Sequence, residues 1–170
     1  CSDAKNEADD QYALVHALLS KKFIIKGLVA GHFRESGTNQ MSYDEMVKLA
    51  KLTNTYGEYP IVLGADGKIS DYQNYEVSAG TELIIKEALK DDLRPLYVVN
   101  IGALTDLATA LLKCPEIESR LTAIWVGGGC YPDGSHECNL NNDLLAANYV
   151  FASQVALWQI PSNAYKTTLV

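Results

Sequence analysis

Short apolar runs alternate with amphipathic segments along almost the whole chain, and this alternation constrains the fold more than any other feature. Strands are predicted at residues 23–30, 60–63, 96–101 and 121–126, where the runs are short and apolar. Helices are predicted at residues 12–19, 42–56, 81–89, 105–112 and 143–153, where apolar residues recur at helical spacing. Such alternation is typical of parallel sheets that are covered on both faces. We therefore predict an α/β protein with a mostly parallel open sheet and helices on both faces, as in Rossmann-like folds.

Local signals place the ends of one of these helices. Ser42 and Glu45 have the spacing of a capping box, so the second helix is predicted to begin at Ser42. Gly57 is predicted to end it, because glycine commonly follows the last turn of a helix. The segment from Gly64 to Tyr75 is rich in turn residues and is predicted to be a loop.

Composition excludes several classes of partner. The 170 residues suit one domain, and the hydrophobic fraction of 48% is that of a globular protein. The net charge of −7 and the absence of basic clusters in the sequence argue against a nucleic-acid partner. No apolar run approaches the length of a membrane span. A small neutral or cation-bridged ligand fits better, while homo-oligomerisation and the cellular compartment, cytoplasmic or exported, are left open.

The first ten residues concentrate oxygen ligands in front of the first predicted helix. Asp3, Asn6, Glu7, Asp9 and Asp10 lie there together. Hard cations such as Ca²⁺ take carboxylate, amide and carbonyl oxygens, so Asp3 with Asp9 or Asp10 could form a cation site. The alternative is that Asp9 and Asp10 are first-turn acids, which the helix dipole favours.

The four cysteines are too few for a disulfide scaffold, and no CxxC pair is present. Cys130, His136 and Cys138 lie on one loop that could hold zinc or close a disulfide, but their spacing matches no established zinc pattern.

The polar clusters follow the predicted strands. They occupy residues 31–39, 102–106 and 127–142. Ligands of parallel α/β sheets bind at the carboxyl ends of the strands, so we expect these clusters to meet at one site. Gly127 to Gly129 is interpreted as a close strand-to-loop turn rather than a phosphate loop, because no P-loop lysine follows. Trp125 could stack on a base or a sugar, although core packing is the more usual role of such an aromatic residue.

Five motifs, in order along the chain, resemble those of the inosine-uridine preferring nucleoside hydrolases. The family's DxDxGxDxDDAxAL loop is matched by CSDAKNEADDQYAL, in which Asp3, Asp9 and Asp10 align with its acids. The other matches are GLVAGH at Gly27 to His32, NIGALTDLATAL at Asn100 to Leu111, IWVGGG at Ile124 to Gly129, and HECNLNNDLLAANYVF from His136 onward.

The resemblance implies Ca²⁺-dependent hydrolysis of the N-glycosidic bond of ribonucleosides to free base and ribose. It implies that Asp3, Asp10 and the Thr105 carbonyl hold the Ca²⁺, and that Asp9 is the general base that activates water. Glu137 and Asn139 map onto residues that hold the ribose hydroxyls, and His32 stands where the family has the asparagine of a Gly-Asn pair that contacts the substrate. We further expect Glu137 and Asn139 to lie in an extended stretch and to project to the same side.

The family has a strand before the aspartate loop and a His-Asp segment after the last motif. Residues 1–170 are therefore expected to form a nucleoside hydrolase-like domain without that first strand and without the C-terminal part. Two alternatives stay open. One is a hydrolase of another glycoside, since Asn6 to Asp10 resembles the NE(A/P)DD loops of bacterial relatives. The other is a non-catalytic sugar-binding module with the same fold.

Overall fold

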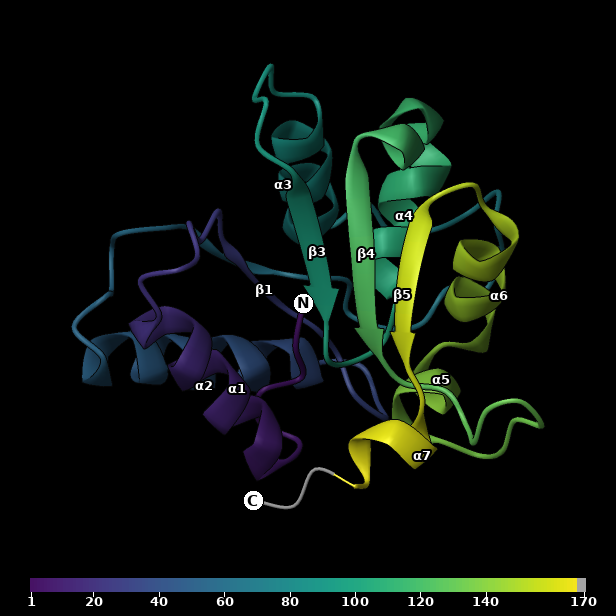
Figure 1. The fold of residues 1–170 in the computed structure, drawn as a ribbon, viewed down its shortest axis with the longest axis horizontal. Helices are drawn as coiled ribbons and strands as arrows, with labels where there is room; N and C mark the ends of the chain where they lie inside the picture. The colour runs from purple at the N-terminus through teal and green to yellow at the C-terminus, as the bar shows by residue number, and fades with distance from the viewer. Residues whose placement is uncertain (168–170) are drawn as a thin grey trace.

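The computed structural model describes residues 1–167 and shows strands and helices in strict alternation over most of the chain (Figure 1). The strands are β1 (Leu28–Ala30), β2 (Ile61–Leu63), β3 (Leu96–Asn100), β4 (Leu121–Val126) and β5 (Ala156–Ile160). The helices are α1 (Ala8–Leu19), α2 (Thr38–Leu52), α3 (Ala79–Ala88), α4 (Thr105–Lys113), α5 (Cys138–Asn142), α6 (Leu144–Ala152) and α7 (Ser162–Tyr165), with the 3₁₀ helix η1 at Pro115–Ser119. None of the described helices is long and apolar enough to cross a membrane.

All strand pairs are parallel, as predicted. β1 pairs with β2, and β3, β4 and β5 pair in that order. The first two residues lie between the two groups. The N–H of Ser2 donates to the carbonyl of Val29 in β1, and the carbonyl of Ser2 accepts the N–H of Gly31. On the other side, the carbonyl of Cys1 accepts the N–H of Ile101, just after β3. The groups are therefore joined edge to edge through residues 1 and 2, which brings the carboxyl ends of β1 and β3 next to the aspartate-rich loop.

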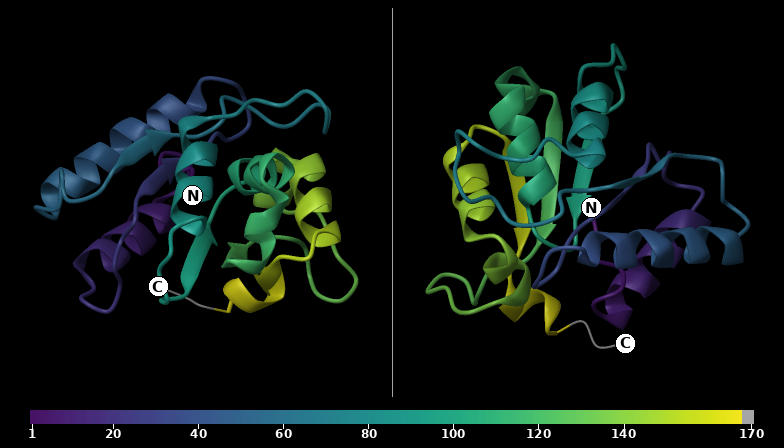
Figure 2. Two further views of the ribbon diagram at one scale, coloured as in Figure 1. Left: turned by 90° about the horizontal axis from the view of Figure 1, so that it is seen from above. Right: turned by 180° about the vertical axis from the view of Figure 1, so that it is seen from behind.

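Two apolar cores show which helices cover which face. One cluster joins α1, β1 and α2, with Leu14, Leu28 and Met46 among its buried members. The other joins α3, α4, α6 and η1 to β3 and β4, with Leu107 and Trp125 fully buried in it. Helices therefore lie on both sides of the sheet, and Figure 2 (right) shows α3, α4 and α6 over the back of the three-stranded group.

The front face of β3, β4 and β5 differs from the predicted double cover. Tyr97, Val99 and Trp158 point outward there and are 44%, 46% and 57% exposed. The rings of Tyr97 and Trp158 lie 5.8 Å apart. No helix of residues 1–167 crosses this face in Figure 1. The described part of the chain therefore leaves an apolar sheet face open.

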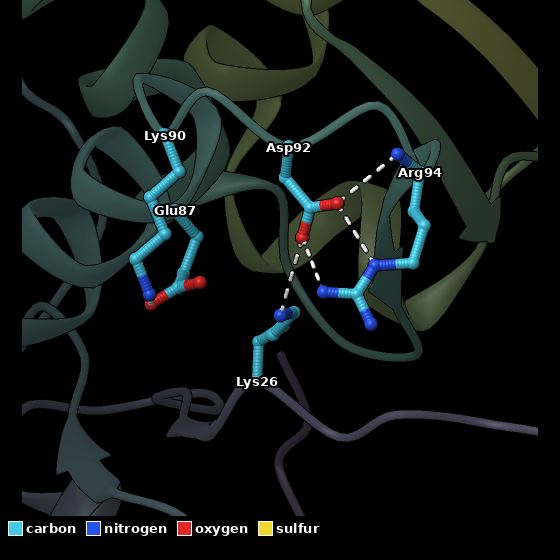
Figure 3. Close-up of polar contacts among 5 residues, drawn as sticks. All are labelled: Lys26, Glu87, Lys90, Asp92 and Arg94. Atoms are coloured by element: carbon cyan, nitrogen blue, oxygen red, sulfur yellow. Dashed lines mark hydrogen bonds and ion pairs between the residues drawn. The ribbon is translucent and has the colours of Figure 1, made fainter.

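An ion pair at the opposite end of the sheet ties β3 to the segment before β1. Figure 3 shows the Asp92 carboxylate facing the guanidinium of Arg94 and the ammonium of Lys26. Arg94 Nε donates to Asp92 Oδ1 at 2.8 Å, and Lys26 Nζ lies 3.6 Å from Oδ2. The hydrogen bonds from Arg94 hold the pKa of Asp92 well below its usual range.

Several predicted boundaries are wrong. The strand predicted at residues 23–30 is confined to Leu28–Ala30, and Phe23 and Ile24 are exposed. Its partner β2 begins just after Pro60, which has no N–H to extend the ladder. β5, α5 and α7 were not predicted, although the alternating pattern ALWQI in β5 is a strand signal.

The predicted capping box is also wrong. Helix α2 begins one turn earlier, at Thr38, and ends at Leu52 rather than near Gly57. Ser42 lies fully buried inside the helix, and Glu45 binds Lys5 and Lys48 instead of reaching back to a helix start.

Candidate functional site

A pocket opens where the ends of β3 and β4 meet the first loop of the chain. The polar cluster predicted at residues 127–142 contributes Glu137, Cys138 and Asn139 to it, and α7 contributes Tyr165. Its lining residues are Asp3, Asn6, Glu7, Asp9, Asp10, Ala13, Ile101, Val126, Glu137, Cys138, Asn139 and Tyr165. Five of the seven residues predicted as site residues line the pocket, whereas His32 and Thr105 do not. The five are Asp3, Asp9, Asp10, Glu137 and Asn139.

Asp3 is the most deeply buried acid of the pocket. It is 1% exposed, and its Oδ2 accepts the side-chain amide of Asn6 at 3.1 Å. Its Oδ1 has no hydrogen-bond partner among the described residues. Burial raises the pKa of Asp3 to about 6. Gly102 leaves room for this carboxylate, because a Cβ at that position would lie 2.7 Å from Oδ1.

Asp10 lies in the first turn of α1 and is also buried. Its Oδ1 accepts the hydroxyl of Ser2 at 2.5 Å. Burial, followed by the charge of Asp3, raises the pKa of Asp10 to about 7. The two carboxylates therefore repel each other, and a bound cation would relieve both the repulsion and the unpaired oxygen of Asp3.

Asp9 lines the same pocket but is exposed, one residue before Asp10. It forms no side-chain hydrogen bond or ion pair with any residue in 1–167. Its carboxylate is therefore free to meet water or a ligand in the pocket.

The described residues contain no cluster of three or more His, Cys, Asp and Glu side chains arranged to hold a metal ion. A cation bound by Asp3 and Asp10 would therefore need backbone, amide or water oxygens for the rest of its shell. The unpaired buried Oδ1 of Asp3 fits this chemistry, since a buried carboxylate oxygen without a donor is costly.

Glu137 and Asn139 do not lie in one extended stretch, contrary to the prediction. Glu137 is the N-cap of α5, and Asn139 lies inside the helix. Both oxygens of Glu137 accept backbone N–H groups. Oε2 accepts those of Gly128 at 2.8 Å and Leu140 at 2.9 Å, and Oε1 accepts that of Asn139 at 3.1 Å. The N–H groups of the first turn of a helix have no partner within the helix, and the Glu137 side chain accepts two of them. This capping explains why the stretch turns into a helix here.

The amide of Asn139 joins the ends of two strands. Its Nδ2 donates to the carbonyl of Ile101 at 3.1 Å and to that of Val126 at 2.9 Å. Both donor hydrogens are thus used by the backbone, and the side chain has its oxygen left for a ligand.

His32 and Thr105 lie together but behind the pocket lining. His32 is 3% exposed at the end of β1, and its Nε2 lies 2.9 Å from the hydroxyl of Thr105. That hydroxyl donates to Asp143 Oδ2 at 2.7 Å. Burial lowers the pKa of His32. The structure therefore places His32 in a buried polar chain at the start of α4, outside the set of residues that line the pocket.

Two residues of this region were missed. Asp143 caps α6 by accepting the N–H of Ala146 and also accepts the N–H of Ile69. It lies inside the motif from His136 onward, which is the signal that could have identified it. Tyr165 donates its hydroxyl to Glu137 Oε1 at 3.3 Å from α7, and burial together with the charge of Glu137 raises the pKa of Tyr165 to about 12.

Cys130, His136 and Cys138 form neither the zinc cluster nor the disulfide that their shared loop left open. All four cysteines are free, and His136 is hydrogen-bonded to Asn141 instead of lying in a cluster of metal ligands. The aromatic Trp125 is fully buried and donates to the carbonyl of Gly102 at 3.1 Å, so it is a core residue and not a stacking platform.

Comparison with known proteins identifies a family. The family model described as inosine-uridine preferring nucleoside hydrolase matches residues 3–170. No curated protein sequence matches the chain.

Solved structures share the fold at low sequence identity. A purine-preferring ribonucleoside hydrolase from Gardnerella vaginalis superposes with a TM-score of 0.78 at 19% identity, over 98% of this chain and 61% of its own. A plant nucleoside hydrolase gives 0.76 at 17% identity, over 94% of this chain and 58% of its own. An inosine-uridine preferring nucleoside hydrolase from Bacillus anthracis gives 0.71 at 16% identity, over 95% and 64%. The chain thus spans less than two thirds of the length of these relatives.

Proposed function

Because the chain belongs to the inosine-uridine preferring nucleoside hydrolase family, we propose that it hydrolyses the N-glycosidic bond of ribonucleosides. In this reaction the bond between C1′ of the ribose and the base nitrogen breaks, a water oxygen bonds to C1′, and the base leaves with a proton. The observation that carries the proposal is the buried pair of Asp3 and Asp10 with the unpaired Oδ1 of Asp3, at the floor of a pocket on the carboxyl side of the sheet.

Asp3 and Asp10 would hold a Ca²⁺ ion, with the Thr105 carbonyl as a further ligand. The bound cation would lower the pKa of a coordinated water and bind the ribose hydroxyls. A cation beside these carboxylates also keeps them ionised, against the burial that raises their pKa values.

Asp9 would accept the proton of the attacking water. Its side chain is exposed to the pocket and free of protein partners, so the carboxylate can approach a water molecule without losing an existing bond. The neighbouring carboxylates also favour the positive charge that develops on the ribose ring in an oxocarbenium-like transition state.

The sugar would be held on the opposite wall, where Glu137 and Asn139 meet the ends of β3 and β4. The free Oδ1 of Asn139 can accept a ribose hydroxyl, while its Nδ2 holds the side chain to the strands. Each oxygen of Glu137 already accepts two hydrogen bonds, so Glu137 would contact a ribose hydroxyl by replacing the hydrogen bond from Tyr165. His32, which lies behind the pocket, would reach the substrate only through its free ring nitrogen.

Hydrolysis of a nucleoside panel by the purified protein, with and without added Ca²⁺, tests the proposal. Asp9→Asn should lower kcat by about 10²- to 10⁴-fold and leave KM nearly unchanged, which is the range expected for loss of a general base. Asp133→Asn, an exposed acid outside the pocket, is the matched control and should keep wild-type kinetics. Equal loss of kcat and of substrate affinity in Asp9→Asn would show that Asp9 is not the base.

The sugar-holding role has its own test. If the Asn139 region binds the 2′-hydroxyl, inosine should be hydrolysed more efficiently than 2′-deoxyinosine by about one to two decades in kcat/KM, because an unpaired buried polar group costs about 1–3 kcal/mol. Equal kcat/KM for the two nucleosides would remove this role.

A further inference from the structure

A second pocket adjoins the first and is lined by basic and amide side chains. Its lining residues are Asn6, Arg34, Lys68, Cys138, Asn141 and Asn142. Asn6 and Cys138 line both pockets, so the two share a wall. The segments that meet here are far apart in sequence: the loop after β1, the loop after β2, and α5.

The two cations of this pocket have no carboxylate partner. Neither Arg34 nor Lys68 forms an ion pair with any residue in 1–167, although the protein carries a net charge of −7. Two acids of these loops accept backbone N–H groups instead. Asp66 accepts the N–H of Gly37, and Glu76 accepts the N–H of Asp66. No Asp or Glu lines the second pocket, so an anion placed there would meet two cations and amide groups but no carboxylate.

Arg34 is held on the pocket wall by its main chain. Its φ of 58° lies in the left-handed region that non-glycine residues rarely adopt. Its backbone N–H donates to Asn142 Oδ1 at 3.1 Å, which fixes this conformation against α5. Unfavourable backbone conformations of this kind collect at ligand-binding sites, where the surrounding structure over-determines them.

The two adjoining pockets differ in the charge of their lining residues. Carboxylates line the first, including Glu7 and Asp9, whereas cations and amides line the second. We propose that the second pocket binds the phosphate of a phosphorylated ribose or ribonucleoside whose sugar occupies the first pocket. Arg34 supplies a planar fork of donors for phosphate oxygens, Lys68 supplies a point charge, and the asparagine amides supply neutral donors. This inference rests on the proposed function only in placing a sugar in the first pocket.

Calorimetric titration of the purified protein with ribose 5-phosphate, ribose and inorganic phosphate tests the inference without any turnover. Ribose 5-phosphate should bind at least tenfold more tightly than either ribose or phosphate. The Arg34→Gln/Lys68→Gln double variant should abolish this advantage and leave ribose binding unchanged. A Lys22→Gln/Lys86→Gln double variant removes the same charge from exposed positions elsewhere and should keep the advantage. Added salt should weaken binding of ribose 5-phosphate but not of ribose.

Equal affinity for ribose and ribose 5-phosphate would overturn the inference, as would an advantage that survives loss of both cations. Binding of ribose 5-phosphate no tighter than that of inorganic phosphate would show an anion site unconnected with the sugar, which also overturns it. Hydrolysis assays separate this from the proposed function. Turnover of inosine without a preference for ribose 5-phosphate leaves only the proposed function standing. Phosphate-dependent binding through Arg34 and Lys68 without nucleoside turnover would support the phosphate site in the second pocket and contradict the proposed function.

Discussion

The hydroxyl of Thr105 donates a hydrogen bond to Asp143 Oδ2 at 2.7 Å, although the two residues are 38 positions apart in sequence. A hydroxyl has one hydrogen, so towards His32 Nε2, 2.9 Å away, Thr105 can only accept. Asp143 also accepts two backbone N–H groups, that of Ile69 on Oδ2 and that of Ala146 on Oδ1. The chain of contacts therefore requires a hydrogen on Nε2 of His32.

This relationship predicts the tautomer of His32. In the wild type, ¹⁵N NMR of the imidazole should show a protonated Nε2 and a bare Nδ1, because Asp143 orients the Thr105 hydroxyl. Thr105→Val removes the hydroxyl with little change of shape and should mix the two tautomers, whereas Thr105→Ser keeps the hydroxyl and should restore the wild-type spectrum. A wild-type spectrum with hydrogen on Nδ1 would refute the assignment.

Cation binding should depend on Asp10. Asp10→Ala removes a candidate ligand and one of the two buried carboxylates of the first loop, Asp3 and Asp10, so it should weaken Ca²⁺ binding by at least tenfold. Calorimetry on the wild type and the variant measures this. Asp133→Ala, which removes an exposed acid outside the pocket, should bind Ca²⁺ as the wild type does. Unchanged affinity in Asp10→Ala would place the cation elsewhere.

Glu137 should contribute to stability as well as to the pocket. Its carboxylate accepts three backbone N–H groups, so Glu137→Ala should lower the free energy of unfolding by about 1–3 kcal/mol. Glu137→Gln keeps one acceptor oxygen for Gly128 and Leu140 and should lose about half as much. Urea unfolding measures both, with the exposed Glu58→Ala as the control. Wild-type stability in Glu137→Ala would mean that the cap is dispensable.

Glu45 should make stability depend on pH. Burial alone would raise the pKa of Glu45, but its hydrogen bonds with Lys48 and Lys5 outweigh burial and lower it. A carboxyl group whose pKa is lower in the folded than in the unfolded state stabilises the fold at any pH above its unfolded-state pKa. This contribution is lost as the pH falls through its folded-state pKa. Glu45→Gln should therefore cost about 0.5–1 kcal/mol at pH 7. Denaturant unfolding across pH should show that the difference in unfolding free energy between the wild type and Glu45→Gln narrows towards pH 3. A difference that does not change with pH would exclude the ion pairs as its cause.

The open apolar face of β3, β4 and β5 should bind a hydrophobic dye. Because Trp158 is 57% exposed and packs against Tyr97, Trp158→Lys should reduce the fluorescence of bound anilinonaphthalene sulfonate and change stability by less than about 0.5 kcal/mol. Leu93→Lys replaces a fully exposed residue outside this face and should leave dye binding unchanged. Equal fluorescence in wild type and Trp158→Lys would show that the dye binds elsewhere.

Periodicity and motif order by themselves determined the α/β class, the parallel sheet and most elements. The strand at Leu121–Val126 was predicted to the residue, because its apolar run ends at a glycine turn. The first-loop acids and the motif from His136 onward marked the pocket, because chain segments after parallel strands must meet at one edge of the sheet.

Tertiary structure alone decided which polar atoms are free. Glu137 and Asn139 looked equivalent in sequence, yet nearby backbone N–H groups occupy the oxygens of Glu137, and two strand carbonyls occupy the amide of Asn139. Ser42 and Glu45 matched a capping box, but packing of α2 against α1 and β1 placed them inside the helix. Arg34 and Lys68 are 34 residues apart and form no basic cluster in sequence. They line one pocket because β1 and β2 are adjacent parallel strands whose loops leave the sheet on the same side, a proximity that local sequence does not encode.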